Sequence, residues 1–271
     1  MFPSLTTTTL READGPLVLL GPSLGTGGER LWAPVVPLLG ERARIVVWDL
    51  PGHGNSPTAQ RGFTVADLAD AVAEIAAAID APYAVHAGVS LGGATGLELG
   101  LRHAGTFSAL AVLCSGAALG TPSAWHERAA LVREHGTAAV VAGSEQRWFA
   151  PGFVAAQPEA AGGLLEALPG VDAESYARCC EALADYDVSA DLGRITDPVL
   201  AVAGADDQVA PPALADRIAR DVRRGRSVTL PGVAHLAPTE DPAATAELLI
   251  SLLEDPSGDP PPTLRPSEET R

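Results

Sequence analysis

The stretch Val85–Gly93 constrains the fold of this 271-residue chain more than any other part of the sequence. An apolar run ends at Gly88, Ser90 follows, and Gly92 lies two residues further on. The spacing is typical of a strand that turns sharply into a helix and carries a nucleophilic serine at the turn. Glycines flank the serine because the two backbone segments of so tight a turn nearly touch. The stretch therefore predicts a strand–helix unit with Ser90 as the candidate nucleophile.

The same five-residue pattern occurs a second time, at Gly21–Gly25, with Ser23 at its centre. Ser90 is followed by a proline-free segment in which Leu97 and Leu101 have helical spacing. Ser23 is followed by Thr and Gly residues, which favour a loop. Only Ser90 has the strand–turn–helix context that a nucleophile of this kind requires.

Predicted strands and helices alternate on both sides of Ser90, which predicts a mostly parallel sheet with helices on both faces. Thr64 and Asp67 have the spacing of a helix-capping pair. Strands are expected at residues 5–10, 16–20, 45–48, 85–89, 109–113, 199–203 and 227–230. Helices are expected at residues 65–79, 91–103, 211–221 and 242–253.

The alternation stops near Gly116, and residues 117–190 carry short helical patterns broken by Gly and Pro. We expect this segment to be a helical lid inserted into an α/β core made of residues 1–116 and 191–254. Residues 255–271 are rich in proline and charge, and they contain one large apolar residue, Leu264. This composition predicts a disordered tail or a linker.

Composition excludes several functional classes. All 18 basic residues are arginine, so chemistry that requires a lysine, including Schiff-base formation and a phosphate-binding P-loop, is excluded. The net charge of −16 argues against nucleic acid or an anionic membrane as a partner. No stretch has the length of a membrane span or the pattern of a signal peptide, which predicts a soluble, cytoplasmic protein. The sequence shows no metal-ligand spacing, and we expect neither a metal nor a cofactor.

Two further turns carry residues that could act with Ser90. The predicted strand at 199–203 leads to Asp206 and Asp207, and the strand at 227–230 leads to His235. In a parallel sheet these turns lie on the same edge as Ser90, where open α/β sheets bind ligands. His235 would take the proton of Ser90, and an aspartate would orient the imidazole. A lone loop histidine or an Asp-Asp turn is usually structural, but the three together, each after a predicted strand, favour catalysis.

Attack of a serine on a carbonyl carbon produces a negatively charged oxygen, the oxyanion, which backbone N–H groups can stabilise. We assign this role to the N–H groups of Leu24 and Leu91. Leu91 follows the serine at the predicted helix start, where N–H groups lack intrahelical partners. Leu24 lies in the early Gly-rich loop, which gives that loop a role other than supplying a nucleophile. The three cysteines have no zinc or disulfide spacing and are expected to be buried, reduced thiols.

Taken together, the motifs resemble those of the α/β-hydrolases, and more closely those of the 3-oxoadipate enol-lactone hydrolases of aromatic-acid breakdown. The matching segments cover residues 16–250, which is nearly the whole predicted fold. The lid segment and the early loop point to the lactonases, whereas the triad motifs indicate only the superfamily. The segments are Ser23–Thr26 with Trp32, Asp49–Pro57, Gly88–Gly93, Arg147–Pro151, Ala203–Asp207 and Gly232–His235.

The resemblance implies an α/β-hydrolase fold and a serine hydrolase that opens an enol-lactone to an oxo-dicarboxylic acid through an acyl-enzyme. It also implies that the acid is Asp207, because Gly204 and Pro211 frame that residue as in the superfamily's turn. A lactone of this class carries a free carboxylate, for which Arg147 is the expected partner, with Trp148 packed against the ring.

Several alternatives stay open at this stage. Arg147 could instead pair with a lid glutamate such as Glu145, and Arg128, Arg133 and Arg178 are further candidates for the carboxylate. The enzyme could be another small-ester hydrolase or a carbon–carbon bond hydrolase with the same triad, or the protein could be a catalytically silent ligand receptor. The tail also resembles the linker that joins some lactonases to a C-terminal carboxymuconolactone decarboxylase domain.

Overall fold

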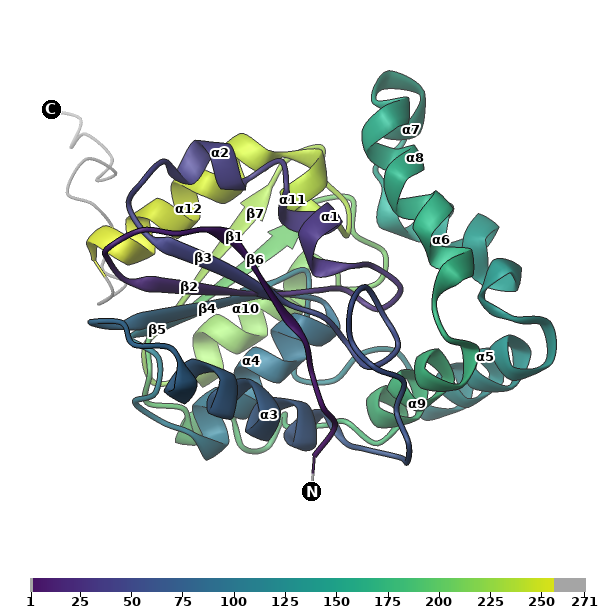
Figure 1. Cartoon of the computed structure of the whole chain (residues 1–271), viewed down its shortest axis with the longest axis horizontal. Coiled ribbons are helices and arrows are strands. Elements are labelled where there is room, and N and C mark those ends of the chain that lie inside the picture. The colour runs from purple at the N-terminus through teal and green to yellow at the C-terminus, as the bar shows by residue number, and fades with distance from the viewer. Residues whose placement is uncertain (1, 256–271) are drawn as a thin grey trace, which may run out of the picture.

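The computed structural model describes residues 2–255 and contains a seven-stranded sheet in the order β1-β3-β2-β4-β5-β6-β7 (Figure 1). β1 runs antiparallel to β3, and the other strand pairs are parallel. All seven strands expected from the sequence are present, and the α/β-hydrolase fold is confirmed. The strands are β1 (Thr7–Arg11), β2 (Leu17–Gly21), β3 (Arg44–Trp48), β4 (Ala84–Val89), β5 (Ala109–Leu113), β6 (Val199–Gly204) and β7 (Gly225–Leu230).

Helices cover both faces of the sheet, as the strand–helix alternation predicts (Figure 1). The expected capping pair is present, because the Asp67 N–H donates to Thr64 Oγ1 at 3.1 Å and the Thr64 N–H donates to Asp67 Oδ2 at 2.9 Å. On one face lie α3 (Val65–Ala78), α4 (Leu91–Arg102) and α10 (Pro212–Asp221). On the other lie α1 (Gly28–Trp32), α2 (Val36–Leu39), α11 (Ala237–Glu240) and α12 (Pro242–Glu254).

Strand pairing determines which loops meet at the carboxyl edge of the sheet. Gly21 at the end of β2 lies opposite Gly88 in β4, so the loop with Ser23 and Leu24 emerges beside Ser90. Gly204 at the end of β6 lies opposite Leu230 at the end of β7, so the loops with Asp207 and His235 emerge side by side. The sheet thus brings together four loops that are far apart in the sequence.

The chain between β5 and β6 is helical and lies to one side of the sheet, at the right of Figure 1. We refer to residues 117–190 as the helical insertion. The division of the chain into core and lid remains a prediction, and the expected tail, from residue 256 onward, lies outside the described residues. The insertion contains α5 (Pro122–His135), α6 (Val141–Trp148), α7 (Phe153–Ala156), α8 (Pro158–Ala167) and α9 (Ala173–Ala184).

Three cysteines and a histidine are buried in the core without an ionic partner among residues 2–255. Cys114, Cys179 and Cys180 are all buried and unpaired, as expected, and burial raises the pKa of each thiol, that of Cys180 to about 12. His86 in β4 is fully buried, stacks on Trp48 and contacts the edge of Phe107.

Over residues 2–255, no helix combines the length and apolar character needed to cross a membrane. The expected cytoplasmic location stays a prediction.

Candidate active site

Ser90 occupies a strained position between β4 and α4. Its φ of 56° and ψ of −113° place a residue that carries a Cβ in a region that side chains disfavour. Such strain is held by the surrounding structure and occurs most often at functional sites. The Ser90 N–H donates to the Leu113 carbonyl at 2.9 Å, and Ser115 Oγ donates to the Ser90 carbonyl at 2.7 Å. The serine is therefore fixed at the tip of the turn.

The glycines around Ser90 are there for the steric reason that the sequence indicates. A Cβ at Gly88 would overlap the carbonyl group of Gly92, and a Cβ at Gly92 would lie 2.7 Å from the Pro22 oxygen. The Gly92 N–H donates to that same Pro22 oxygen at 3.0 Å. This contact joins the start of α4 to the early Gly-rich loop and leaves no room for side chains between them.

Asp207 and His235 form a buried pair at the neighbouring strand ends. Their Oδ2 and Nδ1 atoms are 2.9 Å apart, and both side chains are almost completely enclosed. The other carboxylate oxygen of Asp207 accepts the N–H groups of Val209 at 2.8 Å and Ala210 at 3.0 Å. Asp206 is exposed. The structure therefore brings Asp207, and not its neighbour, into contact with the histidine.

The Leu24 and Leu91 N–H groups are available as hydrogen-bond donors. In the part of the chain that the structure describes, neither group donates to a protein acceptor. Leu91 is the first residue of α4, so its free N–H lies at the N-terminus of the helix, where the positive end of the helix dipole also favours a negative charge. Ser23 is enclosed in a turn in which Thr26 Oγ1 donates to the Ser23 carbonyl at 2.9 Å.

His53, which lies in the segment Asp49–Pro57, contacts the loop of Leu24. Its Nδ1 lies 2.9 Å from the Pro51 carbonyl, and its Nε2 accepts the Gly25 N–H at 3.1 Å. This pattern requires a neutral imidazole with the proton on Nδ1. Burial is the main reason why the pKa of His53 falls to about 4. The only sequence signal for this contact was its place in a Gly-rich turn.

Trp148, at the end of α6, contacts two loops: the one that carries Leu24, here called the candidate oxyanion loop, and the one that carries His235, here called the histidine loop. The side chain is 4% exposed, and a Cβ at Gly25 would lie 3.2 Å from the indole. The Trp148 carbonyl accepts the His235 N–H at 3.1 Å. This one residue of the helical insertion thus contacts both loops.

The insertion arginines fall into two groups. Arg133 and Arg178 form ion pairs with glutamates: both bind Glu174, at 2.7 and 2.8 Å.

Arg147, in contrast, forms no ion pair with any residue in the range 2–255, which removes the expected alternative of a pair with Glu145. Arg128 bonds to neutral partners, donating to the Tyr176 hydroxyl at 2.8 Å and to Ser144 Oγ at 3.2 Å. Burial and the positive charge of Arg128 lower the pKa of Arg147.

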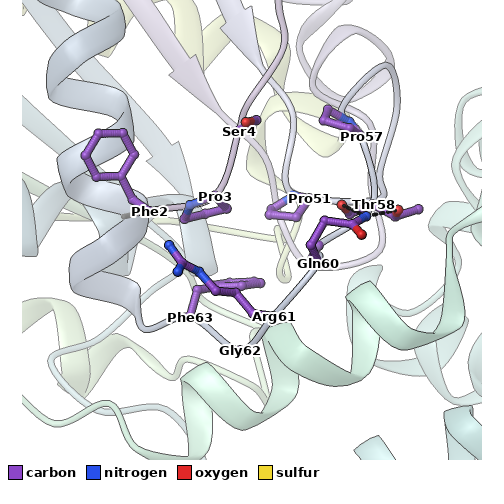
Figure 2. Close-up of a pocket in the computed structure, with 11 residues that line it drawn as sticks. Phe2, Pro3, Ser4, Pro51, Pro57, Thr58, Gln60, Arg61, Gly62 and Phe63 are labelled. Atoms are coloured by element: carbon purple, nitrogen blue, oxygen red, sulfur yellow. Dashed lines mark hydrogen bonds between the residues drawn. The ribbon is translucent and has the colours of Figure 1, made fainter.

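Arg128 and Arg147 line an open cavity of about 500 Å³ that also includes Trp125, Gln208 and Val209. The last two residues follow Asp207 directly, so the cavity reaches the acid loop, but neither Ser90 nor His235 lines it. Another cavity, of about 360 Å³, is lined by Phe2, Pro3 and residues of the loop 57–63, which Figure 2 draws as sticks. No candidate site residue lines it.

No group of three or more His, Cys, Asp or Glu within residues 2–255 could hold a metal ion.

Comparison with known proteins gives the class. Residues 17–248 match the alpha/beta hydrolase family, and the chain belongs to that family. Over 206 residues it is 35% identical to 3-oxoadipate enol-lactonase 2 of Acinetobacter baylyi, covering 76% of this chain and 77% of the relative. The crystal structure of the enol-lactonase from Burkholderia xenovorans superposes with a TM-score of 0.87 at 29% identity, over 93% of this chain and 96% of that one. The chain is thus a carboxylic ester hydrolase.

A second group of relatives has a different name. A Variovorax paradoxus protein that is named for carbamate hydrolysis is 29% identical over 249 residues, covering 89% of this chain and 92% of the relative. Carbamates and lactones both contain an acyl carbon that a serine nucleophile can attack. The family is therefore established, whereas the choice of substrate within it depends on the residues around the site.

Proposed function

We propose that the protein hydrolyses 3-oxoadipate enol-lactone to 3-oxoadipate, as a step in aromatic compound catabolism, through an acyl-enzyme on Ser90. The observation that carries the proposal is the buried Asp207–His235 contact of 2.9 Å, at the sheet edge where the strained Ser90 also lies. The two relatives named as enol-lactonases support the choice of a lactone.

In the first half of the reaction, His235 acts as the general base. Asp207 accepts a hydrogen bond from the Nδ1–H of the imidazole, which leaves Nε2 free to take the proton of the Ser90 hydroxyl. Ser90 Oγ attacks the lactone carbonyl carbon, and the carbonyl oxygen becomes an oxyanion. The free N–H groups of Leu24 and Leu91 stabilise this charge, and losing one such donor typically costs about 3–4 kcal/mol.

In the second half, the intermediate breaks down and water restores the enzyme. The ring C–O bond breaks, the enolate oxygen takes the proton from His235, and the enol, which stays joined to the acyl chain, tautomerises to a ketone. His235 then takes a proton from water, and the resulting hydroxide attacks the acyl carbon. The acyl–Oγ bond breaks, Ser90 recovers its proton from His235, and the product is released with a second carboxyl group, which loses its proton to water.

We assign the carboxylate of the substrate to Arg147, with Trp148 packed against the lactone. A protein of net charge −16 repels an anion at long range, so a local cation is needed. Arg147 has no acidic partner within residues 2–255, and Arg128 adds a second positive charge in the same cavity. A guanidinium can bind a carboxylate through two parallel hydrogen bonds, which gives selectivity as well as affinity.

A substrate panel tests the proposal. We expect the highest kcat/KM for an enol-lactone that carries a carboxylate, lower values for its uncharged ester and for simple esters, and little turnover of carbamates or carbon–carbon substrates. Preference for a carbamate would favour the second group of relatives. Absence of turnover on every member, including an activated ester, would indicate a silent receptor.

A further inference from the structure

The loop that carries His235 is held to the helical insertion through its backbone. The Trp148 carbonyl accepts two N–H groups, from His235 at 3.1 Å and from Leu236 at 3.3 Å. The position of the imidazole therefore depends on where α6 ends. Since α6 belongs to the helical insertion and His235 follows β7, a further group that joins these two segments also affects the position of the imidazole.

The Glu240 carboxylate supplies that group from the last residue of α11. Its Oε1 accepts the N–H groups of Ala234 at 3.0 Å and Leu236 at 3.3 Å, which are the two neighbours of His235. Its Oε2 accepts the N–H of Ala150, at 2.7 Å, just after α6. One side chain thus binds the histidine loop with one oxygen and the insertion with the other.

The role differs from ordinary helix capping. The N-terminus of α12 is capped by the next residue, Asp241, whose carboxylate accepts the Ala244 N–H at 2.9 Å. None of the three donors to Glu240 belongs to α12. Two of them flank His235 directly, so a displacement of the Glu240 carboxylate moves the backbone on both sides of the imidazole.

The ionised carboxylate suits this arrangement because it offers only acceptors to three N–H donors. Partial burial raises the pKa of Glu240, and the hydrogen bonds from the three backbone N–H groups oppose that rise. A neutral amide in the same place has one acceptor atom and one NH₂ group. Whichever way the amide turns, its NH₂ faces either Ala150 or the histidine loop, where an acceptor is required.

We propose that Glu240 is a positioning residue that fixes His235 by joining the histidine loop to the end of α6. The inference rests on the proposed function, in which His235 is the general base. Catalytic groups must be held within a fraction of an ångström, and a displacement of about 1 Å can lower the rate by about 10²-fold.

The test compares Glu240→Gln with Glu247→Gln, a matched change at an exposed position on α12. The substrate is an uncharged activated ester, and kcat is referred to the active sites counted from the acylation burst. We expect Glu240→Gln to lower kcat by about 10- to 100-fold with KM within about twofold, and to slow phosphonylation of Ser90 by a fluorophosphonate to the same degree. Glu247→Gln should match the wild type in both measurements.

Two further variants separate the possible outcomes. Glu240→Asp keeps the charge and both acceptor oxygens on a shorter side chain. If Glu240→Gln unfolds at the assay temperature, Glu240→Asp takes its place in the test. We expect a smaller loss of kcat for Glu240→Asp, again with KM unchanged. Wild-type kcat in either folded Glu240 variant, or a loss confined to KM, overturns the inference. His235→Ala checks the underlying mechanism: if it keeps wild-type activity, the proposed function itself fails.

Discussion

The sheet-edge loops and the helical insertion hold their charged residues in opposite ways. At the sheet edge Asp207 is enclosed, and each of its oxygens has a partner within hydrogen-bonding distance. In the insertion Arg147 is half-buried beside a second arginine and, over residues 2–255, has no acidic partner. The Asp207 carboxylate therefore has its partners without a ligand, whereas the insertion presents positive charge that an anionic ligand would neutralise. We infer that the first region performs the chemistry and that the second selects the substrate.

The largest expected effect tests the assignment of the nucleophile at the sheet edge. Ser90→Ala should abolish turnover while the protein stays folded, since loss of the nucleophile in a serine protease lowers kcat by about 10⁶-fold. Ser23→Ala should have a mild effect, because Ser23 is part of a loop turn. Steady-state kinetics and burst titration with an activated ester measure both. An inactive Ser23→Ala with an active Ser90→Ala would reverse the assignment.

The second prediction tests which of the two adjacent aspartates, Asp206 or Asp207, is the acid that acts with His235. Asp207→Asn should leave His235 in the wrong tautomer and lower kcat by about 10⁴-fold, as the equivalent change does in a serine protease. Asp206→Asn is the control, since Asp206 is exposed. The same activated ester is suitable, and folding is checked by circular dichroism. Comparable losses in both variants would mean that the contact with His235 is not what the activity depends on.

A third prediction uses His86, the buried histidine of β4. Burial lowers the pKa of His86 from 6.5 to about 3, so below pH 6.5 the unfolded chain binds a proton that the folded core excludes. The wild type should lose about 1.4 kcal/mol of stability per pH unit from this residue as the pH falls from about 6.5 toward 3. His86→Leu should flatten that dependence, and His126→Leu, at an exposed site on α5, should not. Urea unfolding from pH 7 to pH 4 measures the slopes, and equal slopes would contradict the expectation.

A fourth prediction tests selectivity in the insertion. Arg147→Ala should raise KM for a carboxylated lactone by about 10- to 100-fold, since a hydrogen-bonded charged group contributes about 1.5–3 kcal/mol. The uncharged ester analogue should be almost unaffected. Arg128→Ala distinguishes the two arginines of the cavity. Equal losses of Arg147→Ala on both substrates would mean that the residue is structural and that the anion is held elsewhere.

The smallest expected effect concerns the paired arginines of the insertion. Arg133 is the main reason why the pKa of Glu174 falls from 4.5 to about 2. The two side chains are 38% and 44% exposed, so solvent screens the pair and Glu174→Gln should cost at most about 1 kcal/mol at pH 7. Because the folded-state pKa is lowered, this stability is present above pH 4.5 and disappears as the pH falls toward 2. Thermal unfolding of Glu174→Gln and of the control Glu166→Gln measures it, and a pH-independent difference would contradict the ion-pair explanation.

Much of the fold was predictable from the sequence because its signals are local. Each strand expected from an apolar run is present, and the helix after Ser90 begins at Leu91. The short helices α1, α2 and α11 were not predicted, because four or five residues are too few to show a helical period. In the candidate site, Ser90 and His235 follow from motif and strand order, whereas the contact of His53 with Gly25 has no signal in the spacing.

The sequence by itself determined the alternation of strands and helices, the steric need for Gly88 and Gly92, and the edge of the sheet at which the loops meet. These depend on residues within a few positions of one another, where periodicity and backbone sterics act directly. Only the tertiary structure decided that Arg147 lacks an acidic partner in the described part of the chain and that Glu240 binds Ala150. Glu240 and Ala150 are 90 positions apart, and such a contact depends on how distant elements pack, which no local pattern records.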